Sequence, residues 1–540
     1  MEQKKEEAMG SGKDLRKEAV TGREESETAQ TGCRAIPKGI MGMALLYGVC
    51  FAIAFYRNFI GLTFPVLTGI TLLICGLFLK KNQIPWKRGN GWYLTACLLL
   101  GVSTVLTTNG IILFFNTAGI LLLVTVFMIR QVYDDKKWGL GQYICNILFL
   151  YLSMVPEVAS PFICGAEYLD KRKKQGANGR HNNAKYIVVG MSVGLPTLLI
   201  LIEVLSSADP IFSEIVGSAF HNLMRQVIFS PDICLVLLLV ILGFFCCYCF
   251  LSALSLGNLP EWKEQSAKKN PVAAITFLSM VTAVYLVFCG IQVVFLFPGG
   301  SLLPEGYTYA EYARQGFFQL LAVCIFNFIL VLACLAVFQR NRILDFLNLV
   351  FSGCTYLMIA SSAFRMLLYI RTYYLSFLRV LVLWFLAALV FLMAGVIGSI
   401  VKKQFPLFRY CMAVVVSCYL VLSFGRVDAV VASYHVDKAK EDICYGDIVY
   451  LTTLSKDAAV ALSSYRFGHE KHMEGAQTYY NYPSHSSADP RKPYYYGCRR
   501  CRLDWYFQDI LDTAEDMDLR TFHFSKYWAV QAAKEYYAGQ

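Results

Sequence analysis

Charged residues are scarce in this sequence. Asp, Glu, Lys and Arg make up 16% of its 540 residues, whereas soluble domains carry about 25%. Hydrophobic residues make up 56%, and the mean hydropathy is +0.48. They come in blocks of roughly 17 to 27 residues, a length that crosses ~30 Å of hydrocarbon. The composition excludes an ordinary soluble protein and predicts an all-α polytopic membrane helix bundle, with the lipid bilayer as its partner.

The sequence also lacks the motifs by which many enzymes are identified. It contains no phosphate-binding glycine loop, no HExxH zinc motif, no serine nucleophile elbow and no protein-kinase signature. These absences argue against an enzyme of the soluble type, and we expect no catalytic residues and no cofactor. A membrane-embedded enzyme stays open as an alternative, because such enzymes often lack these motifs.

The basic residues are concentrated in the hydrophobic part of the chain. Residues 1–38 hold eight basic and eight acidic side chains, and the region from Asp428 onward holds 13 and 16. The region between them holds 28 basic and 14 acidic residues. Lys and Arg in short loops between spans are the signal of the positive-inside rule. The excess therefore needs no nucleic acid to explain it, and we expect no nucleic-acid partner.

Three regions follow from these patterns. Residues 1–38 are rich in Glu, Lys, Gly and Ser, which predicts a disordered cytoplasmic tail without a cleavable signal peptide. Residues 39–426 form the transmembrane helical domain, and residues 427–540 form a small soluble region of mixed α or α+β structure. Twelve hydrophobic segments are expected, at about 40–56, 59–79, 92–108, 110–129, 141–163, 186–205, 232–256, 272–297, 316–338, 343–369, 380–401 and 409–425.

Segment 141–163 is predicted not to cross the membrane. The loops on both sides of it, 130–140 and 165–185, are basic, and Pro156 and Pro161 would break a helix or turn it back. If the segment is re-entrant or interfacial, eleven crossings remain. The N-terminus then lies in the cytoplasm and the C-terminal region outside. A true crossing at this segment would reverse the side of the C-terminal region.

Two loops are too long and too patterned to be simple connectors. Segment 206–231 carries apolar residues at helical spacing, which predicts an amphipathic helix on the membrane surface. Segment 298–315 comes directly before a span, where aromatic residues prefer the membrane interface. Its candidate interface residues are Tyr309, Glu311, Tyr312 and Arg314.

Ionisable residues inside membrane spans are costly and are candidates for function. Here they are Glu157, Glu203 and Arg365, with Asp209 just past the end of a span. Arg365 lies well inside its segment, so we expect it to pair with Glu203 or Asp209 or to face a watery cavity. These four residues are the candidate substrate-binding residues. The alternative is structural, because polar groups often hold membrane helices together.

The C-terminal region contains a small set of His and Cys residues. His469 and His472 are three positions apart, as are Cys498 and Cys501, and together they could supply a zinc site. The spacing fits no standard zinc finger, so a disulfide or free thiols are the competing interpretations. The other cysteines lie mostly inside apolar runs, where cysteine acts as a small hydrophobic residue.

Several stretches together resemble a bacterial multi-pass membrane family, domain-of-unknown-function group 4173, which is related to group 4153. They are GLP at 194–196 followed by LSSADPIF at 205–212, YAEYARQGFF at 309–318, and DAVVA, YLTTLSKDA and FHFSK at 428–432, 450–458 and 522–526. The chain has Ala459 and His523 where members tend to have Pro and Asn. The resemblance covers about 140–530 and implies a location in the bacterial plasma or inner membrane. It implies no activity.

Three functions remain open at this point. The first is a transporter of a small solute or lipid-like molecule, with its site near Glu203, Asp209 and Arg365. The second is a membrane sensor or scaffold whose external C-terminal region binds a ligand or a protein partner. The third is a membrane-embedded enzyme that acts on the cell envelope, which would need convergent carboxylates such as Glu157, Glu203 and Asp209.

Overall fold

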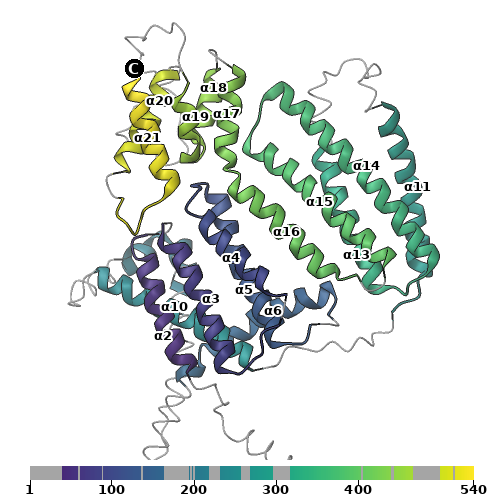
Figure 1. The fold of residues 1–540 in the computed structure, drawn as a ribbon, viewed down its shortest axis with the longest axis horizontal. Coiled ribbons are helices and arrows are strands. Elements are labelled where there is room, and N and C mark those ends of the chain that lie inside the picture. The colour runs from purple at the N-terminus through teal and green to yellow at the C-terminus, as the bar shows by residue number, and fades with distance from the viewer. Residues whose placement is uncertain are drawn as a thin grey trace, which may run out of the picture. The chain divides into compact units, whose positions relative to one another are not determined.

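The computed structural model is helical throughout the residues that it describes, apart from connecting turns, as the sequence predicted (Figure 1). These residues are 39–58, 61–87, 89–135, 138–162, part of 194–217, 231–256, 268–295, 317–402, 405–439, 443–465, 499–514 and 517–539. The helices of the hydrophobic region are α2 (Ile40–Phe55), α3 (Thr63–Lys81), α4 (Gly91–Ser103), α5 (Gly110–Val132), α6 (Leu140–Glu157), α10 (Pro231–Ser255), α11 (Val272–Phe295), α13 (Phe317–Val337), α14 (Arg342–Tyr373), α15 (Phe377–Val401) and α16 (Leu407–Phe424). Those of the C-terminal region are α17 (Val427–Ala439), α18 (Tyr445–Thr453), η1 (Lys456–Ala458), α19 (Ala459–Ser463), α20 (Arg499–Asp512) and α21 (Phe524–Ala538).

The helices of the hydrophobic region are suited to lipid. Nine helices of the described chain are long and apolar enough to cross a membrane, and α2 and α4 are shorter apolar helices. Large apolar side chains on their outer faces are exposed, for example Phe114 at 68%, Met280 at 69% and Val421 at 72%. Such helices are stable when lipid covers these faces. Eleven of the predicted hydrophobic segments match a helix, and the remaining one, 186–205, lies mostly outside the described residues.

The chain divides into two compact units. Unit 1 comprises Met1–Tyr56, Leu73–Pro85 and Asn146–Leu259, and unit 2 comprises Arg57–Leu72, Trp86–Cys145 and Pro260–Gln540. Helices α3 and α6 each begin in unit 2 and end in unit 1. The expected division into a tail, a membrane domain and a C-terminal region remains a prediction.

In unit 1, α2 and α10 approach closely because each has a glycine where they cross. A Cβ atom on Gly48 would lie 2.5 Å from the carbonyl oxygen of Val240, and one on Gly243 would lie 2.6 Å from Cβ of Phe51. A larger residue at either position would push the helices apart. Small residues that allow such close backbone approach are a common means of packing helices in membranes.

Segment 141–163 forms a helix with an interruption near its end. Helix α6 contains Pro156, and the chain turns at 158–159 before one more helical stretch at 160–162. The full segment Leu140–Phe162 is long and apolar enough to cross a membrane, so its expected re-entrant path remains a prediction. In segment 206–231, residues 210–217 are helical and mostly exposed, and their place at the membrane surface is likewise still a prediction.

In unit 2, three helices stand side by side beneath the C-terminal helices. Helices α4 and α5 form a hairpin, and α16 packs against α4 and against α15. Asn109 caps α5, because its Oδ1 accepts hydrogen bonds from the backbone nitrogens of Ile111 and Ile112 at 3.0 and 3.1 Å. Helices α11, α13, α14 and α15 complete the bundle around buried residues such as Leu278, Val331 and Phe351.

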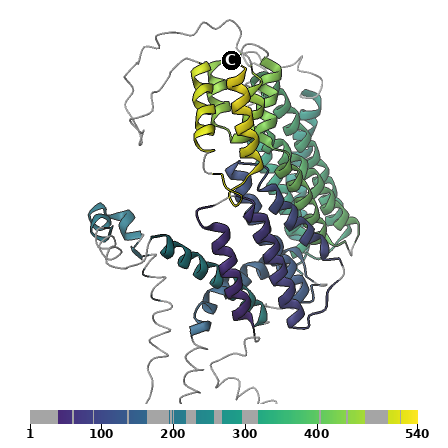
Figure 2. The ribbon, with the colours of Figure 1, turned by 60° about the vertical axis from the view of Figure 1, so that its left-hand side comes forward.

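The C-terminal helices α17–α21 have a core of their own. Val431, Leu462 and Phe507 are fully buried in it, and Ile112 of α5 and Leu422 of α16 join the same core. Figures 1 and 2 show these helices at one end of α4, α5 and α16. The C-terminal region therefore rests directly on the membrane helices of unit 2.

Candidate functional site

Several basic residues gather at one end of unit 2, which we call the basic end. There, the backbone of Lys269, before α11, pairs with Val337 and Gln339 at the end of α13, with N–O distances of 3.0 Å. Arg340, before α14, donates from Nη2 to the carbonyl oxygen of Ser399 near the end of α15 at 3.1 Å. The helix ends gathered here carry Lys269, Arg340 and Arg409.

The opposite end is joined to the C-terminal helices. His435 of α17 lies with Nε2 2.7 Å from the carbonyl oxygen of Leu375 in the turn between α14 and α15. The backbone nitrogen of Phe377 donates to the hydroxyl of Tyr450 in α18 at 2.9 Å. We call this end the C-terminal end of unit 2.

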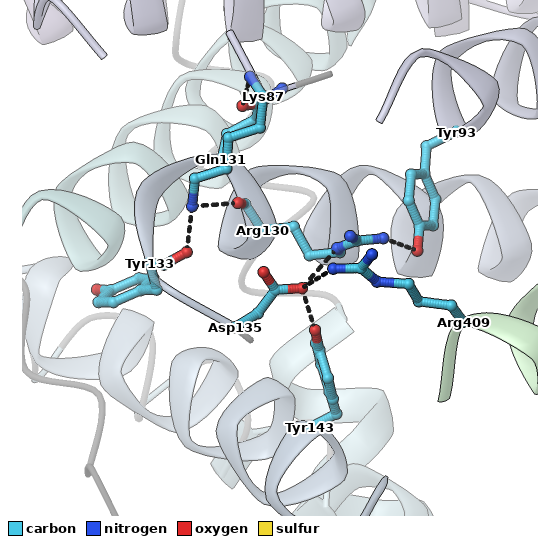
Figure 3. Close-up of polar contacts among 8 residues, drawn as sticks. All are labelled: Lys87, Tyr93, Arg130, Gln131, Tyr133, Asp135, Tyr143 and Arg409. Carbon is cyan, nitrogen blue, oxygen red and sulfur yellow. Dashed lines mark hydrogen bonds and ion pairs between the residues drawn. The ribbon is translucent and has the colours of Figure 1, made fainter. Parts of the chain in front are cut away.

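A buried carboxylate organises the basic end (Figure 3). Asp135, in the connection between α5 and α6, is 7% exposed, and its Oδ2 lies 2.8 Å from Nε of Arg130. Nη2 of Arg409, from α16, lies 3.7 Å from the same oxygen, and Tyr143 of α6 donates its hydroxyl proton to it. Arg130 also donates to the hydroxyl of Tyr93 in α4 at 2.8 Å. Asp135 thus connects the ends of α4, α5, α6 and α16.

A lysine adds a third cation to this cluster. The ammonium group of Lys87 donates to the carbonyl oxygens of Arg130 and Tyr133 at 2.8 and 2.5 Å, as Figure 3 shows. Its backbone nitrogen donates to Oε1 of Gln131 at 3.0 Å. Burial alone would raise the pKa of Asp135, but the hydrogen bond from Tyr143 and the charge of Arg130 lower it below its ordinary value. Asp135 is therefore ionised near neutral pH.

The C-terminal end contains a second polar network, built around a chain segment that lies between two turns of the membrane helices. The backbone nitrogen of Phe524 donates to the carbonyl oxygen of Val105 at 3.0 Å, and the nitrogen of Leu62 donates to that of Phe522 at 3.1 Å. His523, between them, is fully buried with Nε2 3.0 Å from the carbonyl oxygen of Thr104. Segment 520–525 thereby attaches α21 to the membrane helices.

Asp457 is the centre of this network. It is fully buried and accepts hydrogen bonds from Oγ1 of Thr107 at 2.5 Å, from the nitrogen and Oγ1 of Thr108 at 3.1 and 3.2 Å, and from the hydroxyl of Ser525. A buried carboxylate is tolerated when several donors replace water. Here the donors come from the α4–α5 turn and from α21, so Asp457 joins the two parts.

Asp428 makes a second connection to the same turn. Its Oδ2 accepts from Nδ2 of Asn109 at 2.8 Å and from the nitrogen of Ser455 at 3.1 Å. Asp428 is 1% exposed. We name the group formed by Thr107, Thr108, Asn109, Asp428, Asp457, His523 and Ser525 the polar seam.

About two helical turns along α5 from Asn109, a further network joins α4, α5 and α16. Oδ1 of Asn116 accepts from the hydroxyls of Tyr419 and Ser423 at 2.8 Å each, and its Nδ2 donates to Oγ of Ser103 at 2.9 Å. Asn116, Ser103 and Ser423 are fully buried. Asn116 thus holds α4, α5 and α16 together. Uncharged polar residues commonly have this role in membrane helices.

Of the predicted substrate-binding residues, Arg365 belongs to unit 2, and Glu157 and Asp209 belong to unit 1. Arg365 is 7% exposed on α14 and donates from Nη2 to Oε1 of Gln292 on α11 at 3.3 Å. Glu157 is 6% exposed and accepts from the hydroxyls of Ser160 and Ser252 at 2.6 Å each within unit 1. Their role in substrate binding remains a prediction.

Asp209 is exposed and caps a short helix through its Oδ1, which accepts from the nitrogen of Ile211 at 2.9 Å. Glu203 lies outside the described residues, and so do the interface candidates Tyr309, Glu311, Tyr312 and Arg314. The pairing of Arg365 with Glu203 or Asp209 is untested.

Most of the predicted metal or disulfide set also lies outside the described residues, namely His469, His472 and Cys498. Cys501 is half-buried in α20. Among the described side chains, no group of three or more His, Cys, Asp or Glu residues could hold a metal ion. The zinc site, the disulfide and the free thiols all remain predictions for this set of residues.

The sequence did not indicate Asp135, Asp428 and Asp457 as candidate functional residues. Each lies outside the hydrophobic segments, in which an ionisable residue is costly and therefore noticeable. A signal for two of them was nevertheless present. Asp428, Asp457 and His523 belong to the three C-terminal stretches that carried the family resemblance, and the structure brings these stretches together in the polar seam.

Comparison with known proteins gives one family. The family model described as Domain of unknown function (DUF4153) matches residues 94–465. This range includes Arg130, Asp135 and Arg409 of the basic end, and Asp428 and Asp457 of the polar seam. No curated protein and no solved structure matches the chain.

Proposed function

Since the chain belongs to the DUF4153 family of domains of unknown function and is a multi-pass membrane protein, we propose that it is a membrane sensor or scaffold. Its C-terminal helices bind a ligand or protein partner outside the membrane. The polar seam carries this proposal, because its buried carboxylates join the C-terminal helices to the turn between α4 and α5. A domain that is merely tethered to a membrane anchor has no need of such a connection.

The proposal places the N-terminus in the cytoplasm and the C-terminal helices outside a bacterial plasma or inner membrane. The positive-inside rule puts Lys and Arg on the cytoplasmic side, and the basic end of unit 2 carries Lys87, Lys269, Arg340 and Arg409. The C-terminal helices contact the opposite end. Membership in group 4173, a finer assignment within this set of families, belongs to the same proposal.

A thiol-labelling experiment tests this orientation. Cys444 precedes α18 and is exposed, so a membrane-impermeant maleimide should label it on intact cells after mild reduction. The Cys444→Ser variant gives the background from all other cysteines. Labelling of Cys444 only after permeabilisation would contradict an external C-terminal region.

The helices that connect the two ends of unit 2 give the proposal its mechanism. The α4–α5 turn contacts the C-terminal helices at the polar seam, and α4, α5 and α16 are linked to one another at Asn116 and again at Asp135. A rearrangement at the seam would therefore reach the basic end through three helices linked by polar contacts. Coupling of this kind requires that binding favours one of two arrangements of these helices.

Site-specific photo-crosslinking in the cells that make the protein tests partner binding. Trp505 and Tyr527 are 39% and 44% exposed on the C-terminal helices, and Phe326 is 53% exposed on the apolar helix α13. We expect a discrete protein or ligand adduct from positions 505 or 527 that is absent from position 326 and weakened by Asp457→Ala. Equal adducts at all three positions, or none from the C-terminal helices, would refute the proposal.

A transporter is the second candidate, and the burial of Arg365 beside Gln292 between α11 and α14 favours it. Proteoliposomes containing the protein would be incubated with a small-molecule extract of host cells. A transporter predicts accumulation of a solute that Arg365→Gln proteoliposomes do not accumulate, although both proteins insert and fold. Equal accumulation by both would leave Arg365 with a structural role.

A further inference from the structure

An apolar groove lies between α14 and α15 of unit 2. It has a volume of about 510 Å³ and is lined on α14 by Tyr356, Leu357, Ile359, Ala360 and Ala363, and on α15 by Leu383, Leu386, Ala387 and Val390. The three alanines leave the space that a larger side chain would fill. The hydroxyl of Tyr356 donates to the carbonyl oxygen of Val390 at 2.8 Å, which ties the two helices together across the groove.

Two arginines lie beyond the lining of this groove, toward the C-terminal end of unit 2. Residues spaced by three or four positions share one face of a helix. On α14, Ala360 and Ala363 are followed on the same face by Arg371, and on α15, Leu383 is preceded on the same face by Arg379. Both arginines flank the turn between α14 and α15, so they lie at one mouth of the groove.

The position of Arg379 is fixed by its surroundings. Its guanidinium carbon lies 4.3 Å from the ring centre of Tyr369, and its Nη1 donates to the carbonyl oxygen of Tyr373 at 2.6 Å and to that of Tyr374. A guanidinium has five N–H donors, more than these two carbonyls use. Arg371 is exposed in the last turn of α14.

We propose that this groove binds one anionic phospholipid, with an acyl chain between α14 and α15 and the phosphate at Arg371 and Arg379. The inference goes beyond the proposed function, since it concerns a lipid site in the membrane region. Guanidinium groups bind phosphate through paired hydrogen bonds, and basic pockets beside membrane helices hold anionic lipid headgroups. The apolar lining supplies the complementary surface for the chain.

The dimensions of the groove agree with this occupant. At 1.5 Å per residue, Arg371 lies about 22 Å along α14 from Tyr356 and about 12 Å from Ala363. One leaflet contributes about 15 Å of hydrocarbon, with the headgroup layer beyond it. A phosphate at the arginines would therefore let an acyl chain enter the part of the groove near Ala363, whereas Tyr356 lies at the limit of its reach. The positive-inside rule does not explain these arginines, because they lie at the C-terminal end of unit 2, which we propose to be outside the cytoplasm.

Native mass spectrometry of the full-length protein in detergent tests the site. The probes are phosphatidylglycerol and phosphatidylcholine with identical acyl chains, which differ in headgroup charge. We expect one phosphatidylglycerol to remain bound at activation energies that remove phosphatidylcholine, with at least tenfold weaker phosphatidylglycerol binding after Arg371→Gln with Arg379→Gln. Arg342→Gln, at the other end of α14, is the matched control and should leave binding unchanged.

A second pair of variants tests the groove itself. Ala360→Phe fills it, whereas Ala413→Phe makes the same change at an exposed position of α16. We expect only Ala360→Phe to lose the bound lipid. Equal retention of the two lipids by the wild type, or equal loss in both Phe variants, would overturn the proposal. A change of oligomer mass in Ala360→Phe without loss of lipid would also overturn it, because the groove would then hold a second protein helix.

Discussion

Replacing Asp457 by Ala should detach the C-terminal helices from the α4–α5 turn. The carboxylate accepts three hydrogen bonds from Thr107 and Thr108 and one from Ser525. Hydrogen bonds to a charged group contribute about 1.5–3 kcal/mol each, so the three to the turn amount to about 4–5 kcal/mol at the low end. The two threonine hydroxyls can find other partners, which reduces the expected loss to about 3 kcal/mol.

Hydrogen–deuterium exchange of the protein in lipid nanodiscs at pH 7 measures this loss locally. A factor of ten in an equilibrium corresponds to 1.4 kcal/mol, so a loss of about 3 kcal/mol should accelerate exchange on the order of 100-fold. The acceleration should appear in peptides that cover 104–109 and 523–530. Peptides from α13, which has no contact with the polar seam among the hydrogen bonds described, should exchange as in the wild type.

Asp437→Ala is the control, because Asp437 is an exposed carboxylate on α17. It removes the same charge from the C-terminal helices without touching the seam, and we expect exchange to change by less than about threefold, equivalent to less than ~0.7 kcal/mol. If Asp457→Ala changes exchange no more than Asp437→Ala, buried charge does not hold the C-terminal helices to the membrane region. The sensor or scaffold proposal would then lose its main support.

Three further predictions concern other contacts. Gly48→Val should destabilise unit 1 by about 1–3 kcal/mol through overpacking against α10, seen as a lower melting temperature, whereas Gly42→Val, with open space around it, should not. Burial lowers the pKa of His523 to about 4, so the unfolded state binds more protons between pH 6.5 and 4. Stability should be complete above pH 6.5 and fall by about 3 kcal/mol as the pH drops to 4, a pH dependence that His523→Gln should lack. Asp135→Asn should lower the free energy of unfolding by about 3–5 kcal/mol, because Arg130 stays buried without its carboxylate. The double variant Arg130→Met with Asp135→Asn should recover much of that loss. A double variant less stable than Asp135→Asn would contradict this explanation.

The hydrophobic pattern by itself determined the fold class and nearly every helix before residue 426, but not the helices of the C-terminal region. Continuous apolar runs of sufficient length can satisfy their backbone in lipid only as helices, so α5, α10, α13 and α15 appear where the sequence predicts them. Basic residues in short connections are expected to share one side of the membrane. That prediction agrees with the basic end, where residues near 269, 340 and 409 gather.

Which polar residues meet was decided only by the tertiary structure. Asp457 and Thr107 are 350 positions apart, and Asp428 and Asn109 are 319 apart, and no local pattern encodes such pairs. Charges outside the apolar segments carry no periodic signal, so Asp135 was not distinguished from other loop acids. The apolar groove between α14 and α15 could not be predicted from the sequence either. Its two walls come from separate helices, and its volume depends on how these helices pack. Local hydrophobicity fixes where helices form, whereas their packing fixes which buried charges find partners.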